Sequence, residues 1–296
     1  MKQLIVNADD FGISEGVNRG IVEAHRQGIL TSTTLMANMP AFEQAIALSS
    51  ENPDLGVGIH LNLTAGVPLL PTSEVSTLVS EDGRFLRMGV ALRQLTLGRL
   101  DLQQVEAELG AQVEKSLAAG IVPTHLDSHH HLHTHPALQP TAISLALRHG
   151  IGGVRSTIEL GLADGVGQAG MLLRGTREGE RETVRGRYLK GIVLSLLGRM
   201  LQAKARRAGL ATPSHFRGIL LGMAFGPTAL HRALRSLPEG ATELMCHPGY
   251  PDDALKRETS YSSGRDSELR ALTDPVSREI LNERDIHLVR YSDLTR

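Results

Sequence analysis

The stretch Gln3-Leu4-Ile5-Val6-Asn7-Ala8-Asp9-Asp10-Phe11-Gly12-Ile13-Ser14 opens with a short apolar run that stops at two adjacent acids. Such a run is typical of a buried strand that ends in a loop. Ser14 can then cap a helix that stops at Gly28, because apolar residues recur between these two positions at helical spacing. The N-terminal segment therefore predicts a strand, a loop and a helix.

The same alternation recurs along the chain. Further candidate strands are Leu55–Leu61, Ile121–Leu126, Gly153–Ser156, Glu243–Cys246 and Ile286–Val289. Candidate helices are the segment capped by Asp101 and ending at Gly120, then Ala137–Arg148, Thr228–Leu237 and Asp266–Arg284. Strands that alternate with helices predict a parallel sheet. Over 296 residues this pattern favours one α/β domain, a (β/α) barrel-like fold of the distorted TIM type spanning residues 1–296, over two separate domains.

One basic stretch interrupts this alternation. Arg174 to Arg207 holds ten basic and three acidic residues, whereas the rest of the chain holds 21 basic and 29 acidic residues. Within it, apolar residues between Tyr188 and Leu210 recur at helical spacing. We interpret residues 170–212 as a basic helical insertion. A basic amphipathic helix can lie on an anionic membrane surface; the alternatives are packing on the barrel or on a second subunit of a homodimer.

Composition excludes several other classes. The formal net charge of -1 argues against binding a phosphate backbone, and 3% aromatic residues without Trp provide few stacking platforms, so we expect no nucleic-acid partner.

The single cysteine, Cys246, cannot form an internal disulfide. No signal-peptide pattern or membrane-spanning segment is apparent. We expect a cytoplasmic location, with peripheral contact at the inner face of the membrane if the basic helix binds lipid.

The segment from Thr124 to His135 is the richest in chemistry, since it holds six of the 13 histidines. Imidazole is a common ligand for zinc and other transition ions, and the spacing of His125 and His129 can bring two rings together at a strand end. A single ion takes two or three histidines, so the remaining rings need other roles. The alternative is a histidine-rich surface loop.

Asp9 and Asp10 form a second polar group at the end of the first predicted strand. Successive strand residues point to opposite faces, so the two acids cannot do the same job unless the backbone turns between them. One carboxylate can bind a metal while the other acts as a base. The alternative is an acidic pair that only precedes a helix N-terminus.

Two more histidines, His60 and His247, end predicted strands. In a parallel barrel the catalytic groups gather at the carboxyl ends of the strands. Each histidine alone is better explained as a hydrogen-bonded core residue. Together with the acidic pair and the histidine-rich segment, they predict one site at this end of the sheet.

Four strings carry a family resemblance: NADDFG at 7–12, GIHLNLT at 58–64, THLDSHHHLH at 124–133 and MCHPGY at 245–250. They resemble the YdjC/ChbG family of carbohydrate deacetylases, metal-dependent enzymes that remove N-acetyl groups from amino sugars on a barrel-like fold. The resemblance implies Asp10, His60 and His129 as metal ligands, Asp9 as general base and His247 as the acid. The basic Arg174–Arg207 segment is most similar to the branch found with hopanoid biosynthesis, HpnK.

Two imidazoles and one carboxylate leave positions open for water and a substrate carbonyl, as metal-assisted amide hydrolysis requires. Such hydrolysis also needs a base for the water and an acid for the departing amine. We expect one divalent ion. The resemblance implies Mg²⁺, and the nitrogen donors suit Zn²⁺ equally well.

Further roles are open for the neighbouring residues. Asp127 and His125 are candidates to orient a ligand ring, and His125 is an alternative ligand. Arg155 and His131 are candidate substrate-binding residues, although Arg155 can instead orient a carboxylate. His130, His133 and His135 remain unassigned.

Three rival functions remain. A metallophosphoesterase on a barrel would need a phosphate clamp, and no Gly-rich phosphate loop flanks the motifs. Non-haem iron oxygenases share the ligand set, but they usually have β-sandwich folds. A non-catalytic histidine-rich metal-binding protein would hold several ions per chain. The favoured hypothesis is a hydrolase that deacetylates an N-acetylglucosamine-type glycan or a hopanoid-linked glycolipid.

Overall fold

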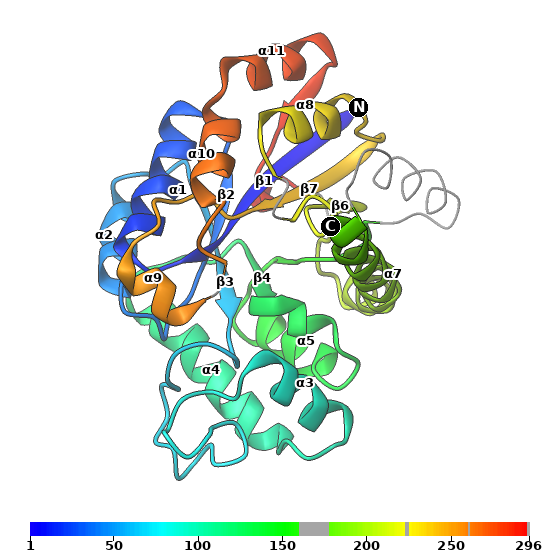
Figure 1. Cartoon of the computed structure of the whole chain (residues 1–296). Coiled ribbons are helices and arrows are strands. Elements are labelled where there is room, and N and C mark those ends of the chain that lie inside the picture. The colour runs from blue at the N-terminus through cyan, green and yellow to red at the C-terminus, as the bar shows by residue number, and fades with distance from the viewer. Residues whose placement is uncertain (160–177, 223–224, 260, 295–296) are drawn as a thin grey trace.

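A parallel sheet forms the centre of the molecule in the computed structural model, which describes residues 1–159, 178–222, 225–259 and 261–294 (Figure 1). The strands are β1 (Lys2–Phe11), β2 (Ser32–Leu35), β3 (Gly56–Leu61), β4 (His125–Ser128), β5 (Gly153–Val154), β6 (His215–Arg217), β7 (Gly240–Cys246) and β8 (Ile286–Leu288). Their order is β5-β4-β3-β2-β1-β7-β6, and β8 pairs with the beginning of β1. Every pairing between these strands is parallel.

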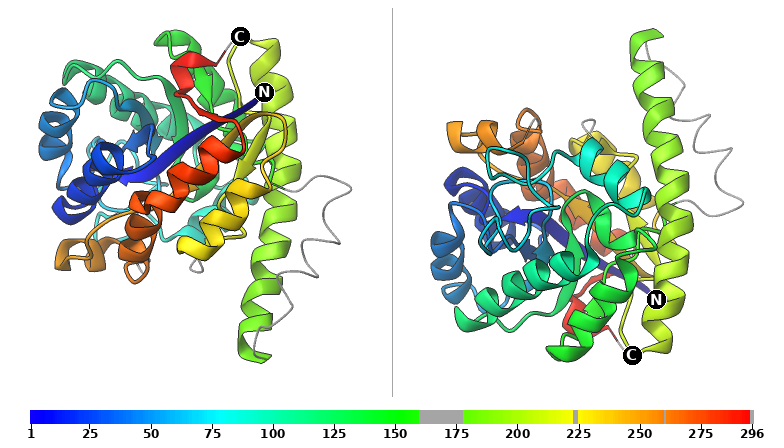
Figure 2. Two further views of the ribbon diagram at one scale, coloured as in Figure 1. Left: turned by 90° about the horizontal axis from the view of Figure 1, so that it is seen from above. Right: turned by 90° about the horizontal axis from the view of Figure 1, so that it is seen from below.

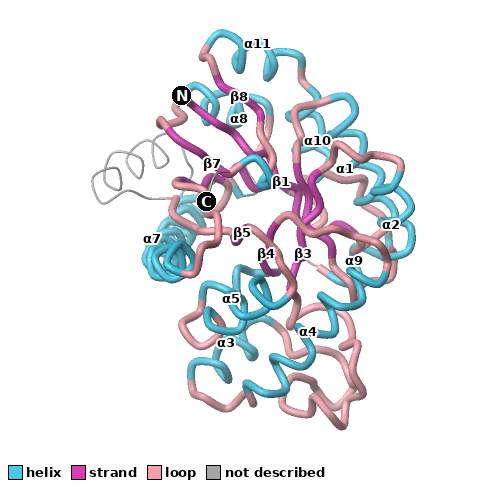
Figure 3. The backbone as a smooth tube through the Cα atoms, turned by 180° about the vertical axis from the view of Figure 1, so that it is seen from behind, coloured by secondary structure: helices cyan, strands magenta, loops and turns pink. Residues whose placement is uncertain are grey.

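Helices surround this sheet (Figures 1 and 3). The α-helices are α1 (Glu15–Gln27), α2 (Phe42–Ser50), α3 (Met88–Thr96), α4 (Leu102–Ala118), α5 (Gln139–Arg148), α7 (Glu178–Arg207), α8 (Pro227–Arg235), α9 (Asp253–Glu258), α10 (Arg265–Thr273) and α11 (Pro275–Glu283). The described residues also include the 3₁₀ helices η1 (His129–Thr134) and η3 (Tyr291–Asp293). The sheet curls with β5 and β6 at its two ends, so the predicted barrel-like α/β fold is confirmed as a half-barrel.

Helix caps follow the sequence signals. The Ser14 side chain accepts a hydrogen bond from the N–H of Val17, and Asp101 accepts one from Gln103 at the start of α4. The prediction of one helix over Asp266–Arg284 is wrong, because Asp274 caps a new helix and Pro275 occupies its first turn.

The strand predictions were less complete. β2 and β6 were not predicted, because they are short and carry polar residues rather than an apolar run. The fourth strand was predicted too early, since β4 begins at His125 and not at Ile121. These segments form strands because neighbouring strands provide their backbone hydrogen bonds. The local sequence indicates such pairing only weakly.

Two groups of buried apolar side chains form most of the core. One lies around β1 and the helices α1, α8, α10 and α11, and includes Val6 and Ile21. The other lies around β3, β4, α4 and α5, and includes Ile59 and Leu109. The central strands are therefore held firmly, and the residues at their carboxyl ends are positioned by rigid backbone.

Helix α7 runs along one side of the molecule and extends past its body (Figure 2). Leu194, Leu201 and Ala205 on this helix are buried. The helix lies within the basic insertion that the sequence predicts at residues 170–212; the positions 170–177, with Arg174 and Arg177, are outside the described residues. Among the described helices, none is long and apolar enough to cross a membrane.

Candidate active site

A cavity of about 260 Å³ opens at the carboxyl ends of the central strands. The floor is formed by residues from β1, β3, η1 and the loop after β7. These floor residues are Asp9, Asp10, His60, His129 and His247. The four separate motifs that the sequence analysis singled out thus meet in one pocket, as expected for parallel strand ends.

The backbone turns between the two acids of β1. Asp10 has a φ of 70°, in the left-handed region, and the pairing of β1 with β2 is irregular between Ala8 and Phe11. Regular alternation would send the two carboxylates to opposite faces. Because of this turn, both Asp9 and Asp10 line the cavity. An unfavourable conformation at a buried non-glycine residue is typical of a functional site.

Asp10, His60 and His129 form a buried cluster in which one ligand atom from each lies within 4.8 Å of the others. Asp10 Oδ1 is 3.1 Å from His129 Nδ1 and 3.5 Å from His60 Nε2. Arg265 Nη2 contacts the other oxygen, Asp10 Oδ2, at 2.5 Å. One carboxylate oxygen and two ring nitrogens therefore converge on one point, an arrangement that fits a divalent ion.

Asp127 orients the ring of His60. Its Oδ1 is 2.7 Å from His60 Nδ1, and its Oδ2 accepts a hydrogen bond of 3.1 Å from the Thr34 hydroxyl. In the neutral ring, a proton held on Nδ1 leaves the lone pair of Nε2 directed toward Asp10, where a bound ion would take the place of the second proton. Burial acts to lower the pKa of His60, but the carboxylates of Asp127 and Asp9 outweigh it and raise this pKa to about 9.

Arg155 is fully buried and joins three carboxylates beneath the cavity. Its guanidinium donates to both oxygens of Asp9 at 2.8 and 2.6 Å, to Glu243 at 2.9 Å, and lies 2.8 Å from Asp127. The Tyr291 hydroxyl donates to Glu243 from the other side. Of the roles weighed for Arg155, these contacts fit the orientation of carboxylates.

Arg155 also distinguishes between two candidate clusters. Asp9, His60 and Asp127 are close enough to hold an ion as well. However, Arg155 donates to both oxygens of Asp9 and lies against Asp127, whereas Arg265 contacts Oδ2 of Asp10 and the Oδ1 of Asp10 faces the two rings. Burial acts to raise the pKa of Asp9, but the charge and hydrogen bonds of Arg155 outweigh it and hold this pKa well below the ordinary range. Asp10, His60 and His129 are therefore the better candidate ligands.

His247 lies at the end of β7, on the cavity wall. Its backbone N–H donates to Glu268 Oε2 at 2.6 Å, and its Nδ1 lies 4.0 Å from Glu268 Oε1. The Tyr261 hydroxyl donates to the same carboxyl group. Burial lowers the pKa of His247 to about 4, against the opposite effect of Asp10 and Asp9, and burial raises the pKa of Glu268 to about 7.

The other histidines of the rich segment have different surroundings. His125 stacks on the ring of Tyr291, with the centroids 3.6 Å apart, and belongs to neither cluster. The rings of His130 and His133 make hydrogen-bonding contacts with Thr64 and Ser128 respectively. These three side chains thus have structural partners within the described part of the chain.

His131 lines the cavity beside the floor. Its ring meets Phe216 edge-on, and its Nδ1 is buried without a hydrogen-bond partner among the described residues. A ring that lines the cavity suits the substrate-binding role that the sequence suggested for His131. His135 is only partly buried, and burial lowers its pKa.

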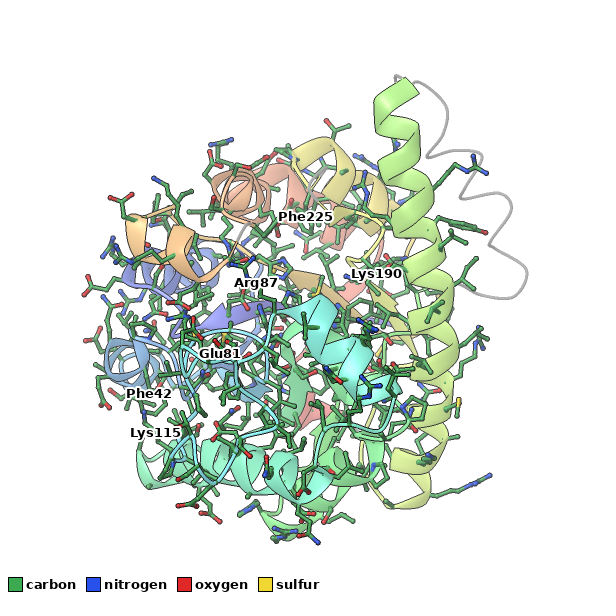
Figure 4. The ribbon with its side chains drawn as sticks, turned by 60° about the horizontal axis from the view of Figure 1, so that its bottom comes forward. Phe42, Glu81, Arg87, Lys115, Lys190 and Phe225 are labelled. Carbon is green, nitrogen blue, oxygen red and sulfur yellow. The ribbon has the colours of Figure 1, made fainter. Side chains whose placement is uncertain are left out.

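Two cations from α7 line the opposite wall of the cavity, together with the glycine-containing loop that follows β6. Lys190 lies on the side of α7 that faces the body of the molecule, across from Phe225 (Figure 4). Burial lowers the pKa of Lys190. Arg187 Nη1 donates to the Leu221 carbonyl at 3.3 Å. This wall brings α7 into direct contact with the pocket.

The residues on this wall and around His247 were not predicted as site residues from the sequence; they are Arg187, Lys190, Tyr261, Arg265 and Glu268. They come from helices and from loops without a recognisable motif. Only the net positive charge of the Arg174–Arg207 segment signalled an unusual role for that region.

The fold and the pocket define a barrel-like α/β protein with a carboxylate–imidazole site at its strand ends. The chain belongs to the YdjC-like protein family, whose model matches residues 3–283. It is 38% identical over 293 residues to a carbohydrate deacetylase of Brevibacillus brevis, covering 99% of each chain. It is 37% identical over 290 residues to a carbohydrate deacetylase of Geobacillus stearothermophilus, covering 98% of this chain and 96% of that relative.

A solved structure shows the same fold. The crystal structure of an Enterococcus faecalis V583 protein, associated by name with cellobiose-phosphate cleavage, has a TM-score of 0.73 and 28% sequence identity. The match covers 100% of this chain and 99% of that one. The family resemblance drawn from the four motifs is thereby confirmed.

Proposed function

We propose that this protein is a metal-dependent hydrolase that removes an N-acetyl group from an amino sugar. The enzyme class is supported by the family and by curated relatives that are named carbohydrate deacetylases over nearly their whole length. The observation that carries the proposal is the buried cluster of Asp10, His60 and His129, with Asp9 and His247 beside it in one cavity.

One divalent ion would be held by Asp10, His60 and His129. Two nitrogen donors and one carboxylate suit Zn²⁺, and Mg²⁺ is the ion implied by the family resemblance. When bound, such an ion supplies a Lewis acid that makes water more acidic and polarises the amide carbonyl. Asp127 keeps the Nε2 lone pair of His60 directed at that position.

Asp9 is the proposed general base. Arg155 keeps the Asp9 carboxylate ionised and holds it with two hydrogen bonds. The ionised carboxylate can accept a proton from the attacking water. The same pairing makes Asp9 a weak base in the resting chain. Proton transfer to it therefore has to accompany attack on the amide carbon.

His247 is the proposed acid for the departing amine. Its backbone contact with Glu268 fixes the start of the loop, and its ring borders the cavity. With a pKa of about 4, the ring is mostly neutral near neutral pH, so it must gain a proton before it can donate one. The carboxylates of Asp9 and Asp10 favour that protonated form.

The rival functions receive less support. A metal-storage protein would present many free imidazoles, whereas His125, His130 and His133 are engaged by Tyr291, Thr64 and Ser128. No observation in the described residues favours a phosphoesterase over an amidase. The hopanoid branch, the cytoplasmic location and the oligomeric state stay predictions.

Acetate release tests the proposal. The protein is stripped with a chelator, then assayed alone, with Zn²⁺ and with Mg²⁺ on N-acetylglucosamine oligosaccharides and on an N-acetylglucosaminyl hopanoid. We expect release only with metal restored, and the preferred substrate decides between glycan and glycolipid. Ion bound in full without acetate release from either substrate would contradict the proposal.

A further inference from the structure

The outer face of α7 carries an exposed apolar stripe. Leu189, Val193, Leu196 and Met200 are exposed by 63%, 54%, 52% and 46%. Their spacings of four, three and four residues place them along one line of the helix. Other exposed apolar residues lie elsewhere in the described chain, such as Val122 in the loop between α4 and β4.

The opposite face of α7 packs on the rest of the molecule. Leu194, Leu201 and Ala205 are buried against the barrel. The Thr157 hydroxyl donates to the Leu194 carbonyl at 2.7 Å, and the Ser195 hydroxyl accepts from the Glu159 N–H. The exposed stripe is therefore a second apolar face of an anchored helix, and none of the described residues buries it.

The charged residues in the stretch of α7 that carries the stripe are all basic. From Thr183 to Arg207 the sequence has no acidic residue. Arg185, Lys204 and Arg207 are exposed, and helical geometry places them on the same outer face as the stripe. Apolar side chains edged by basic residues match the hydrocarbon boundary and anionic headgroups of a lipid surface.

We propose that the outer face of α7 docks this protein on the surface of an anionic lipid bilayer. A second copy of the chain fits this face less well, because two identical basic surfaces would repel each other. The same helix contributes Lys190 and Arg187 to the wall of the candidate active site, so docking brings the pocket close to the bilayer. The inference does not depend on the reaction catalysed.

Vesicle co-sedimentation of the full chain tests the docking. The lipids are phosphatidylcholine alone and phosphatidylcholine mixed with phosphatidylglycerol. We expect binding only to the anionic vesicles, weakening as salt is raised. Each of Lys204→Gln and Arg207→Gln should lower the partition coefficient by about fivefold, and the triple variant Leu189→Gln/Val193→Gln/Leu196→Gln should abolish binding.

A matched triple variant, Val90→Gln/Leu97→Gln/Val122→Gln, removes exposed apolar residues elsewhere and should bind like the unmodified chain. Acetate release from a soluble oligosaccharide should be equal in both triple variants, which separates a docking failure from a catalytic one. Equal vesicle binding by all variants would overturn the proposal. So would a dimer in analytical ultracentrifugation that the α7 triple variant dissociates while vesicles bind none of these proteins.

Discussion

The floor of the pocket and its α7 wall are built in different ways. On the floor, Asp9, Asp10 and His60 are at most 3% exposed, and each contacts at least one oppositely charged or hydrogen-bonding group. On the wall, Lys190 reaches the cavity from a helix that lies at the edge of the molecule (Figure 4). The floor rests on central strands and the wall on a peripheral helix.

This difference suggests a division of labour. Groups that must hold an ion and move protons need fixed geometry, which buried strand ends provide. Substitutions that change the charge or the surface of a peripheral helix leave the central sheet undisturbed. Changes on the floor should therefore abolish the reaction, whereas changes on the wall should alter binding.

The largest effect is expected from His60→Ala. Loss of one of three ligands should remove the bound ion and lower acetate release by at least about a thousandfold. Metal content by mass spectrometry and turnover are measured on the same sample. His287→Ala, which changes a half-exposed histidine on β8, is the control and should keep both. A His60→Ala protein with full ion content would show that the floor is assigned incorrectly.

Asp127→Asn should have a smaller effect. The substitution keeps the shape of the side chain but removes the charge that orients His60 and balances Arg155. Metal affinity should fall about ten- to hundredfold, measured by competition with a fluorescent chelator. Unchanged affinity would mean that the ring of His60 is held by its packing alone.

Lys190→Gln tests the wall. Losing a charged hydrogen-bond donor at the pocket should raise KM by about tenfold while kcat and ion content stay the same. The control is Arg185→Gln, on the same helix but exposed and absent from the cavity lining. A fall in kcat with unchanged KM would mean that Lys190 takes part in the reaction step, and the distinction between floor and wall would then be wrong.

The last effect concerns stability rather than the reaction and lies behind the wall, at Glu159. Its carboxylate accepts hydrogen bonds from the N–H groups of Gly218 and Leu220, and burial raises its pKa from 4.5 to about 7. Between these values the folded state keeps a proton that the unfolded state has released, so stability falls as pH rises through this window.

Glu159→Gln removes that titration. The free energy of unfolding of the variant, relative to the unmodified chain, should increase by up to about 3 kcal/mol across the window. Urea unfolding at both ends of the window measures it, with exposed Glu283→Gln as the control. A difference that does not change with pH would show that Glu159 does not titrate in this range.

The sequence predicted the floor better than the wall for a physical reason. Parallel strands bring their carboxyl ends to one edge, so Asp10, His60 and His129 could be grouped from motifs far apart in the chain. Strand alternation predicted that the two acids face opposite sides unless the backbone turns between them. The left-handed backbone at Asp10 provides that turn, and the sequence does not show it. Lys190 and Glu268 could not be placed, because a helix pattern does not show which neighbour the helix packs on.

The two adjacent acids have different proposed roles, Asp9 as general base and Asp10 as metal ligand. Asp9→Asn and Asp10→Asn, compared side by side for ion content and acetate release, test these roles directly. We predict that Asp9→Asn keeps one ion per chain and loses about a hundred- to ten-thousandfold in turnover, whereas Asp10→Asn loses both the ion and the turnover. Retention of the ion by Asp10→Asn together with its loss from Asp9→Asn would contradict the assignment.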